Sequence, residues 1–156
     1  MNNLKTLRIE NNLLQNDLAK LLKISQNGYS QYENSQRNIP INILKTLAKH
    51  YNTSIDYLVG ITNNKKPYKK SIIKNEFKDI NRLKEIREDR DLTQIEIAKL
   101  LNMSRAGYSL YEININEIPV KNLIKLAVFY NLSIDYILYL TDQRTAHDKI
   151  TKEEIT

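Results

Sequence analysis

The sequence predicts an all-α protein built from two tandem copies of one five-helix module. Only three glycines and three prolines interrupt the 156 residues, and apolar residues recur at helical spacing. The strongest observation is an internal repeat. Residues 4–62 align with residues 83–141 without a gap, and 27 of the 59 aligned positions are identical. We call these two segments repeat one and repeat two.

The first two helices of repeat one follow from the spacing of apolar residues. Leu4 and Leu7 predict a first helix that ends at the polar residues 10–12. A second helix begins at Gln15, and its small Ala19 allows another helix to approach closely. The residues of this helix that we expect to face the core are Leu18, Leu21 and Leu22.

The last three helices of repeat one are marked by capping and breaking residues. Ser25 suits the start of a third helix because its hydroxyl can accept from the free amides of the first turn, and Tyr29 and Tyr32 share the inward face. Pro40 ends the following loop, and Ser54 caps a short fifth helix. The apolar stripe of the fourth helix is Leu44, Leu47, Ala48 and Tyr51. Repeat two reproduces each of these signals.

Four acidic residues at equivalent positions of the two repeats receive structural roles. Glu33 and Glu112 each end a third helix without a second carboxylate beside them, so we expect structural hydrogen bonds there and not acid catalysis. Asp56 and Asp135 lie in the first turn of a short helix, where an acid interacts favourably with the helix dipole.

The composition restricts the classes of function. The chain has no cysteine and two histidines, so neither a thiolate metal site nor a histidine-rich cluster is predicted. No convergent set of acid, base and nucleophile is found, and we predict a non-enzymatic protein without metal, cofactor or small-molecule ligand. No apolar run approaches the roughly 20 residues of a membrane span, and no secretory signal is recognised. The net charge of +6 makes a polyanion the first partner to consider.

One sequence motif marks the third helix of both repeats. Ser-x-x-Gly-Tyr-Ser-x-Tyr-Glu occurs at residues 25–33 and again at residues 104–112, after a helix that carries an alanine. With the closing Ser-Ile-Asp-Tyr, this arrangement resembles the helix-turn-helix of the lambdoid phage repressor and Cro (Xre-type) family. The resemblance implies a sequence-specific regulator of double-stranded DNA, encoded by a phage or mobile element and cytoplasmic in a bacterial cell or phage-infected host.

The outward face of the third helix in repeat one carries the candidate base-reading residues. A helix in the major groove meets a distinct pattern of donors and acceptors on each base pair. Amide side chains can pair bidentately with adenine. The outward-facing and N-terminal residues are Gln26, Asn27, Ser30 and Gln31. The resemblance further implies that Gln15 touches phosphate and braces this helix, and that Arg37 contacts phosphate.

The charge is distributed unevenly along the chain. Residues 1–62 carry +3 and residues 63–82 carry +5, whereas residues 83–141 and 142–156 each carry −1. Because phosphate contacts supply much of DNA affinity, we assign DNA binding to repeat one and to a basic linker at residues 63–74. The linker residues expected on phosphate are Lys65, Lys66, Lys69 and Lys70.

The remaining boundaries follow from the same patterns. Apolar residues recur every three positions from Phe77, so the second domain is placed at residues 75–141 with a first helix that begins early, near Asn75. The polar residues 142–156 form a C-terminal tail. Residues 1–62 form the first domain.

The outward face of repeat two differs from that of repeat one. Four positions that are polar in repeat one have become Ala106, Leu110, Ile113 and Ile115. Two uses of this face stay open. Leu110, Ile113 and Ile115 can form the interface of a homodimer, which we favour because exposed apolar patches generally mark interfaces. Alternatively, a second DNA site comprises Gln94, Arg105, Ala106 and Leu110, since arginine pairs with guanine and apolar groups contact the thymine methyl.

The predicted function is transcriptional regulation, by repression through occlusion of the polymerase. The alternative is a protein-binding inhibitor that reuses the helix-turn-helix scaffold, of the antitoxin or phage counter-defence type. In that case the apolar face of repeat two would bind the partner.

Overall fold

The computed structural model describes residues 2–72 and 81–148, and this part of the chain forms ten α-helices and no strand. The helices of repeat one are α1 (Leu4–Glu10), α2 (Gln15–Leu22), α3 (Gln26–Glu33), α4 (Ile41–Tyr51) and α5 (Ile55–Val59). Those of repeat two are α6 (Leu83–Asp89), α7 (Gln94–Leu100), α8 (Arg105–Glu112), α9 (Val120–Tyr130) and α10 (Ile134–Ile137). The predicted all-α fold with two five-helix domains is confirmed.

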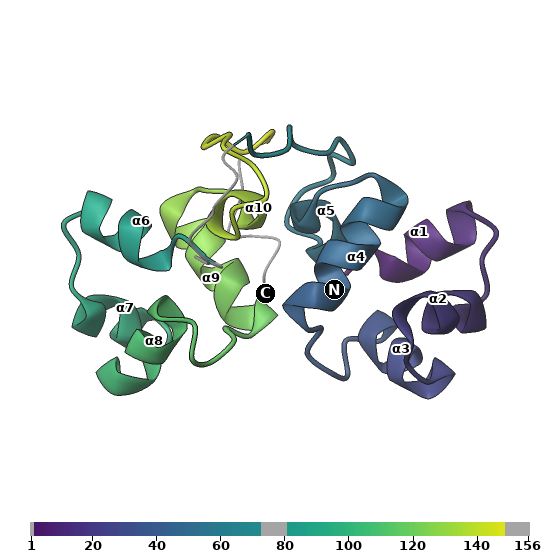
Figure 1. Cartoon of the computed structure of the whole chain (residues 1–156), viewed down its shortest axis with the longest axis horizontal. Coiled ribbons are helices and arrows are strands. Elements are labelled where there is room, and N and C mark those ends of the chain that lie inside the picture. Colours follow the sequence, from purple (N-terminus) through teal and green to yellow (C-terminus); the bar gives the residue numbers. More distant parts are fainter. Residues whose placement is uncertain (1, 73–80, 149–156) are drawn as a thin grey trace.

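The two repeats lie side by side and are related by an approximate two-fold rotation (Figure 1). Helices α4 and α5 of repeat one and α9 and α10 of repeat two occupy the centre, and the other three helices of each repeat lie on the outside. Helices α3 and α8 lie along the same edge of the molecule, at the bottom of Figure 1, whereas the chain that follows α5 crosses the opposite edge.

The core of each repeat is built from the expected apolar stripes and one fully buried tyrosine. Tyr29 and Tyr108 are both 0% exposed and pack among leucines and isoleucines of the surrounding helices. One expectation is wrong, because Leu21 is 43% exposed. On α2, Ala19 and Leu22 lie to one side of Leu18 and face the core with it, whereas Leu21 lies to the other side and points to solvent.

Helix α6 begins at Leu83, as α1 begins at Leu4, and both helices have seven residues. An early, continuous start of this helix is not observed, because Asn81 and Arg82 are not helical. The Arg82 amide donates instead to the carbonyl of Ile137 at 2.7 Å, which joins the start of α6 to α10. The rest of the predicted extension, residues 75–80, lies outside the described residues, as does much of the predicted tail.

Candidate nucleic-acid interface

Helices α3 and α8 begin with the same serine cap. Ser25 Oγ accepts from the Gly28 amide at 3.0 Å, and Ser104 Oγ accepts from the Gly107 amide at 3.0 Å. A Cβ at Gly28 would lie 3.2 Å from Ser25 Oγ, so a glycine gives this cap its room. The turn before α3 contains Lys23 in the left-handed conformation, at φ 55°. The start of each third helix is therefore fixed by local hydrogen bonding.

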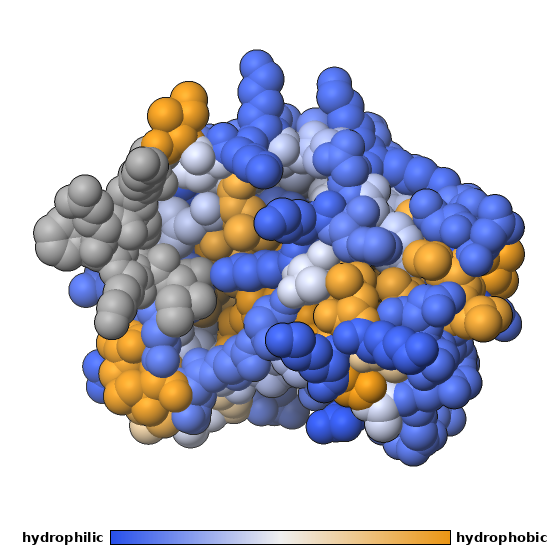
Figure 2. Space-filling view, turned by 45° about the vertical axis from the view of Figure 1, so that its right-hand side comes forward, coloured by the Kyte–Doolittle hydropathy of each residue, from blue (hydrophilic) through white to orange (hydrophobic). Residues whose placement is uncertain are grey.

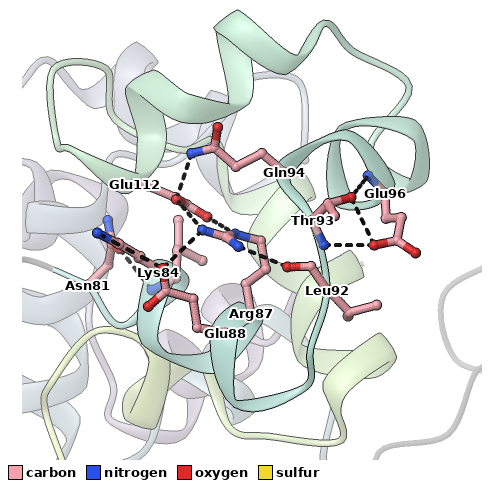
Figure 3. Close-up of polar contacts among 10 residues, drawn as sticks. Asn81, Lys84, Arg87, Glu88, Leu92, Thr93, Gln94, Glu96 and Glu112 are labelled. Atoms are coloured by element: carbon pink, nitrogen blue, oxygen red, sulfur yellow. Dashed lines mark hydrogen bonds and ion pairs between the residues drawn. The ribbon is translucent and has the colours of Figure 1, made fainter.

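A buried glutamate braces each third helix against the first two helices. In repeat two, Glu112 accepts from Arg87 Nε at 2.6 Å and from Gln94 Nε2 at 3.0 Å (Figure 3). The equivalent network in repeat one joins Glu33 to Arg8 and to Gln15, whose Nε2 donates at 3.0 Å. The structural roles predicted for the two glutamates are observed.

Electrostatics favour the charged form of these glutamates. Burial alone would raise the pKa of Glu33, but hydrogen bonds from Arg8 and Gln15 bring the pKa below its ordinary value. The same opposition, with Arg87 and Gln94 as donors, lowers the pKa of Glu112. Each third helix is thus held by a charge-assisted network that stays ionised at neutral pH.

This network engages the side chains of Arg8 and Gln15. Arg8 is not free to contact the DNA backbone, because its side chain is 14% exposed and is held by Glu33 and the Leu13 carbonyl. Gln15 is also bound to Glu33, which supports its predicted bracing of α3. Its predicted contact with phosphate stays a prediction.

The predicted base-reading residues of repeat one lie together on the outward side of α3. Gln26 and Asn27 are exposed at its N-terminus, and Ser30 and Gln31 are half-exposed one turn further on. Arg37 is exposed in the following loop, with its guanidinium 5.8 Å from the centre of the Tyr32 ring. The structure therefore presents four hydrogen-bonding side chains and one cation beside each other.

The corresponding side of α8 is exposed but chemically different. Arg105 and Ala106 are exposed at its N-terminus, and Leu110 is half-buried. Ile113 and Ile115, at the end of α8 and just beyond it, are 59% and 67% exposed. None of these residues takes part in the contact between α5 and α10. On the face shown in Figure 2, hydrophobic patches lie across the middle and at the edges, between hydrophilic side chains.

Two aspartates join the repeats to one another. Asp56 Oδ1 accepts from the Ile134 amide at 2.8 Å, and Asp135 Oδ2 accepts from the Ile55 amide at 3.0 Å. Each carboxylate thus caps the short helix of the other repeat. Both side chains are buried in this contact, and burial raises the pKa of each, with the negative charge of Asp56 adding to the effect on Asp135.

Further contacts reinforce this junction. Tyr68 donates to Asp56 Oδ2 at 2.8 Å, and its ring stacks on His147 at a centroid distance of 4.1 Å. Near the recognition side, Glu117 of repeat two accepts from the Ile41 amide of repeat one at 2.9 Å. These contacts fix α3 and α8 relative to each other within a single chain.

The linker lysines do not join this surface. The described part of the linker, residues 63–72, crosses the edge of the molecule opposite α3 and α8 (Figure 1). Lys65 pairs there with Glu10 at 2.6 Å. Lys66, Lys69 and Lys70 are exposed on this same segment. These four lysines therefore lie away from α3 and α8, and their predicted contact with phosphate stays a prediction.

Comparisons with known proteins agree with this geometry. The helix-turn-helix family matches residues 4–58 and again residues 83–137. The chain belongs to this family, in its Cro/C1 (Xre) type. The family consists of transcriptional regulators and not of enzymes, in agreement with the sequence prediction.

The curated relatives are bacterial regulators. The chain is similar to the uncharacterized HTH-type transcriptional regulator YobD of Bacillus subtilis, with 36% identity over 61 residues, or 39% of this chain and 54% of YobD. It is also similar to the HTH-type transcriptional regulator ImmR of the same organism, with 40% identity over 57 residues, or 36% of this chain and 45% of ImmR. The chain thus spans about half the length of these relatives. No solved structure matches it.

Among residues 2–72 and 81–148, no helix is long and apolar enough to cross a membrane. Within the same ranges, no three histidine, cysteine or acidic side chains are grouped as a metal site requires.

Proposed function

We propose that this chain is a sequence-specific regulator that binds double-stranded DNA with both of its recognition helices, α3 and α8. The observation that carries the proposal is their placement along one edge of the molecule, in an approximate two-fold arrangement (Figure 1). Paired helix-turn-helix heads read two half-sites about one helical turn apart, at roughly 34–36 Å. Here both heads belong to one chain.

The proposed contacts divide into two kinds. The exposed side chains of α3, including Gln26, Asn27 and Gln31, read base edges in the major groove. Arg37 and Gln15 contact phosphates and set the register of the helix on the duplex. Occupying a promoter in this way would exclude the polymerase, which makes repression the expected outcome.

A single chain replaces the homodimer that the sequence favoured. The two-fold contact that a homodimer would supply is made between α5 and α10, through Asp56 and Asp135. The dimer proposed through Leu110, Ile113 and Ile115 is then not required for reading two half-sites.

Selection of bound fragments from a random pool of duplex DNA tests the proposal, followed by affinity measurements at several salt concentrations. We expect an enriched sequence and an affinity that falls steeply with salt. Gln31→Ala should reduce affinity for the enriched site by about 1–3 kcal/mol. The matched control, Lys66→Gln with Lys69→Gln and Lys70→Gln, should leave both affinity and salt slope unchanged. Absence of sequence enrichment would contradict the proposal.

One observation favours a second candidate function. Ile113 and Ile115 expose apolar surface beside α8, as a protein-binding inhibitor of the antitoxin or counter-defence type would require. Such an inhibitor has no reason to bind DNA in a salt-dependent way. The same salt titration therefore separates the two functions.

A further inference from the structure

The two recognition helices have equivalent supports but unlike outward surfaces. Their serine caps have the same length of 3.0 Å, and the glutamine that braces each helix donates at 3.0 Å. The outward residues differ at three equivalent positions. Gln26, Asn27 and Gln31 of α3 correspond to Arg105, Ala106 and Leu110 of α8.

These differences change which bases each helix can recognise. Amide side chains on α3 match the donor and acceptor pair of adenine. On α8, the guanidinium fork of Arg105 matches the two acceptors of guanine, while Ala106 and Leu110 offer only apolar contact, for which the thymine methyl is the partner in the major groove. No base edge satisfies both Gln31 and Leu110 equally.

The fold gives α8 access to the same duplex as α3. Both helices lie along one edge of the molecule, and the reciprocal caps of Asp56 and Asp135 hold the repeats together. Arg105 is exposed at the start of α8 and forms no ion pair within the described part of the chain. A duplex bound to α3 would therefore also contact the unpaired cation of Arg105 at the start of α8.

We infer that the operator of this protein is not a palindrome but a pair of unlike half-sites, an adenine-containing half read by α3 and a guanine- and thymine-containing half read by α8. This inference rests on the proposed function. It specifies the class of DNA that a chain with these two recognition helices would bind.

The half-sites are also expected to differ in strength. Arg37 in repeat one corresponds to Asn116 in repeat two, and Gln36 corresponds to the exposed Ile115. Repeat two therefore presents fewer groups that can bind phosphate after its recognition helix. The α3 half-site should therefore supply most of the binding affinity, and the α8 half-site a smaller part.

An exchange of surfaces tests the inference. The wild-type protein is first used to select its operator. Half-sites are then recombined into two palindromes, one containing the α3 half twice and one containing the α8 half twice. A first variant, Arg105→Gln with Ala106→Asn and Leu110→Gln, gives α8 the surface of α3. A second variant, Gln26→Arg with Asn27→Ala and Gln31→Leu, makes the reverse exchange.

We expect the wild type to prefer the unlike pair over either palindrome by about tenfold or more. The first variant should prefer the palindrome of α3 halves, and the second should prefer the palindrome of α8 halves. Circular dichroism and thermal unfolding check that both variants fold, and the two exchanges are independent of one another.

Three results would overturn the inference while leaving the proposed function intact. The wild type could select a true palindrome, it could select sequence information in one half-site alone, or both exchanges could leave the preferences of folded variants unchanged. A wild-type protein that selects no sequence at all would instead overturn the proposed function.

Discussion

Repeat one and repeat two have nearly the same internal architecture but different exposed recognition surfaces. The residues they share include the serine caps, the buried tyrosines Tyr29 and Tyr108, and the arginine, glutamine and glutamate that brace each third helix. The residues that differ include the outward-facing side chains of α3 and α8. The comparison teaches that the scaffold specifies where a recognition helix lies, while a few exposed positions specify what it can bind.

The repeats also differ in how charge is placed around their recognition helices. Residues 1–62 carry +3, whereas residues 83–141 carry −1. Since cations on phosphate contribute to affinity without sequence information, repeat one should anchor the molecule on DNA. Repeat two would then add discrimination more than affinity.

The largest expected effect comes from removing the buried brace. Glu33→Ala leaves the largely buried Arg8 side chain without its ion-pair partner and should lower the free energy of unfolding by about 3–5 kcal/mol. Glu112→Ala should have a smaller effect in the same direction, because Arg87 keeps a second ion pair with Glu88 at 3.6 Å. Denaturant unfolding measures both. The control Glu10→Gln removes an exposed pair with Lys65 and should have little effect. If the control and the two brace variants lost similar amounts of unfolding free energy, the buried ion pairs would not be what stabilises the third helices.

The stabilising contribution of the aspartates between the repeats should change with pH in the opposite direction to that of the glutamates that brace the third helices. The pKa values of Asp56 and Asp135 are raised, so their contribution is present at low pH and is lost as pH rises through the folded pKa. The pKa values of Glu33 and Glu112 are lowered, so their contribution is lost as pH falls.

The free energy of unfolding should therefore decline as the pH rises from about 4 to about 7, through the ordinary and then the raised pKa values of the two aspartates, and it should also decline as the pH falls below about 4. Asp135→Asn should flatten the first decline and leave the second. Calorimetry across this range checks both. A stability that rises steadily between about pH 4 and about pH 7 would contradict the assignment of the junction.

A pair of opposite substitutions tests the difference in phosphate anchoring. Arg37→Ala should weaken binding to all sequences alike and reduce the salt slope by about one unit. Asn116→Arg should increase the slope by about one unit, because it gives repeat two the cation of repeat one. Fluorescence anisotropy at several salt concentrations measures both slopes. If neither slope changes, the loops after α3 and α8 do not lie on the DNA backbone.

The smallest expected effect concerns the start of the second helix. Thr93 and Glu96 cap α7 reciprocally, since the Glu96 amide donates to Thr93 Oγ1 at 3.2 Å and the Thr93 amide donates to Glu96 Oε2 at 2.7 Å (Figure 3). In repeat one Leu14 takes the threonine position and only Asp17 caps, accepting from the Leu14 amide at 2.7 Å.

Leu14→Thr should therefore raise the free energy of unfolding by about 1 kcal/mol, and Thr93→Ala should lower it by about 1 kcal/mol. Thermal unfolding of the two variants checks the signs. A loss of stability in Leu14→Thr would show that the exposed leucine contributes more than a cap.

Much of each repeat could be predicted from the sequence because the determining interactions are local. Helical spacing together with capping and breaking residues located the ten helices, and Ser25 and Ser54 cap α3 and α5 as expected, accepting from the Gly28 and Tyr57 amides. The inward direction of Tyr29 and Tyr32 is also confirmed, with 0% and 4% exposure. Each of these features depends on residues within one turn or on one helical face.

The relation between the repeats could not be predicted in the same way. Asp56 was expected to interact with the dipole of its own helix, but it caps the helix at Ile134, which is 78 positions away. Helical periodicity shows that a face is apolar and does not show which face covers it. A charge count likewise does not show where charges lie in space. It assigned the linker lysines to DNA, whereas the chain carries them along the edge of the molecule opposite α3 and α8 (Figure 1).

The number of chains on one operator tests the central claim most directly. Sedimentation equilibrium of the protein alone, and then of its complex with the selected operator, measures this number. We predict a monomer in solution and one chain per operator, with both half-sites protected from cleavage by hydroxyl radicals. Two chains on one operator, each protecting a single half-site, would contradict the account and would favour a dimer formed through Leu110, Ile113 and Ile115.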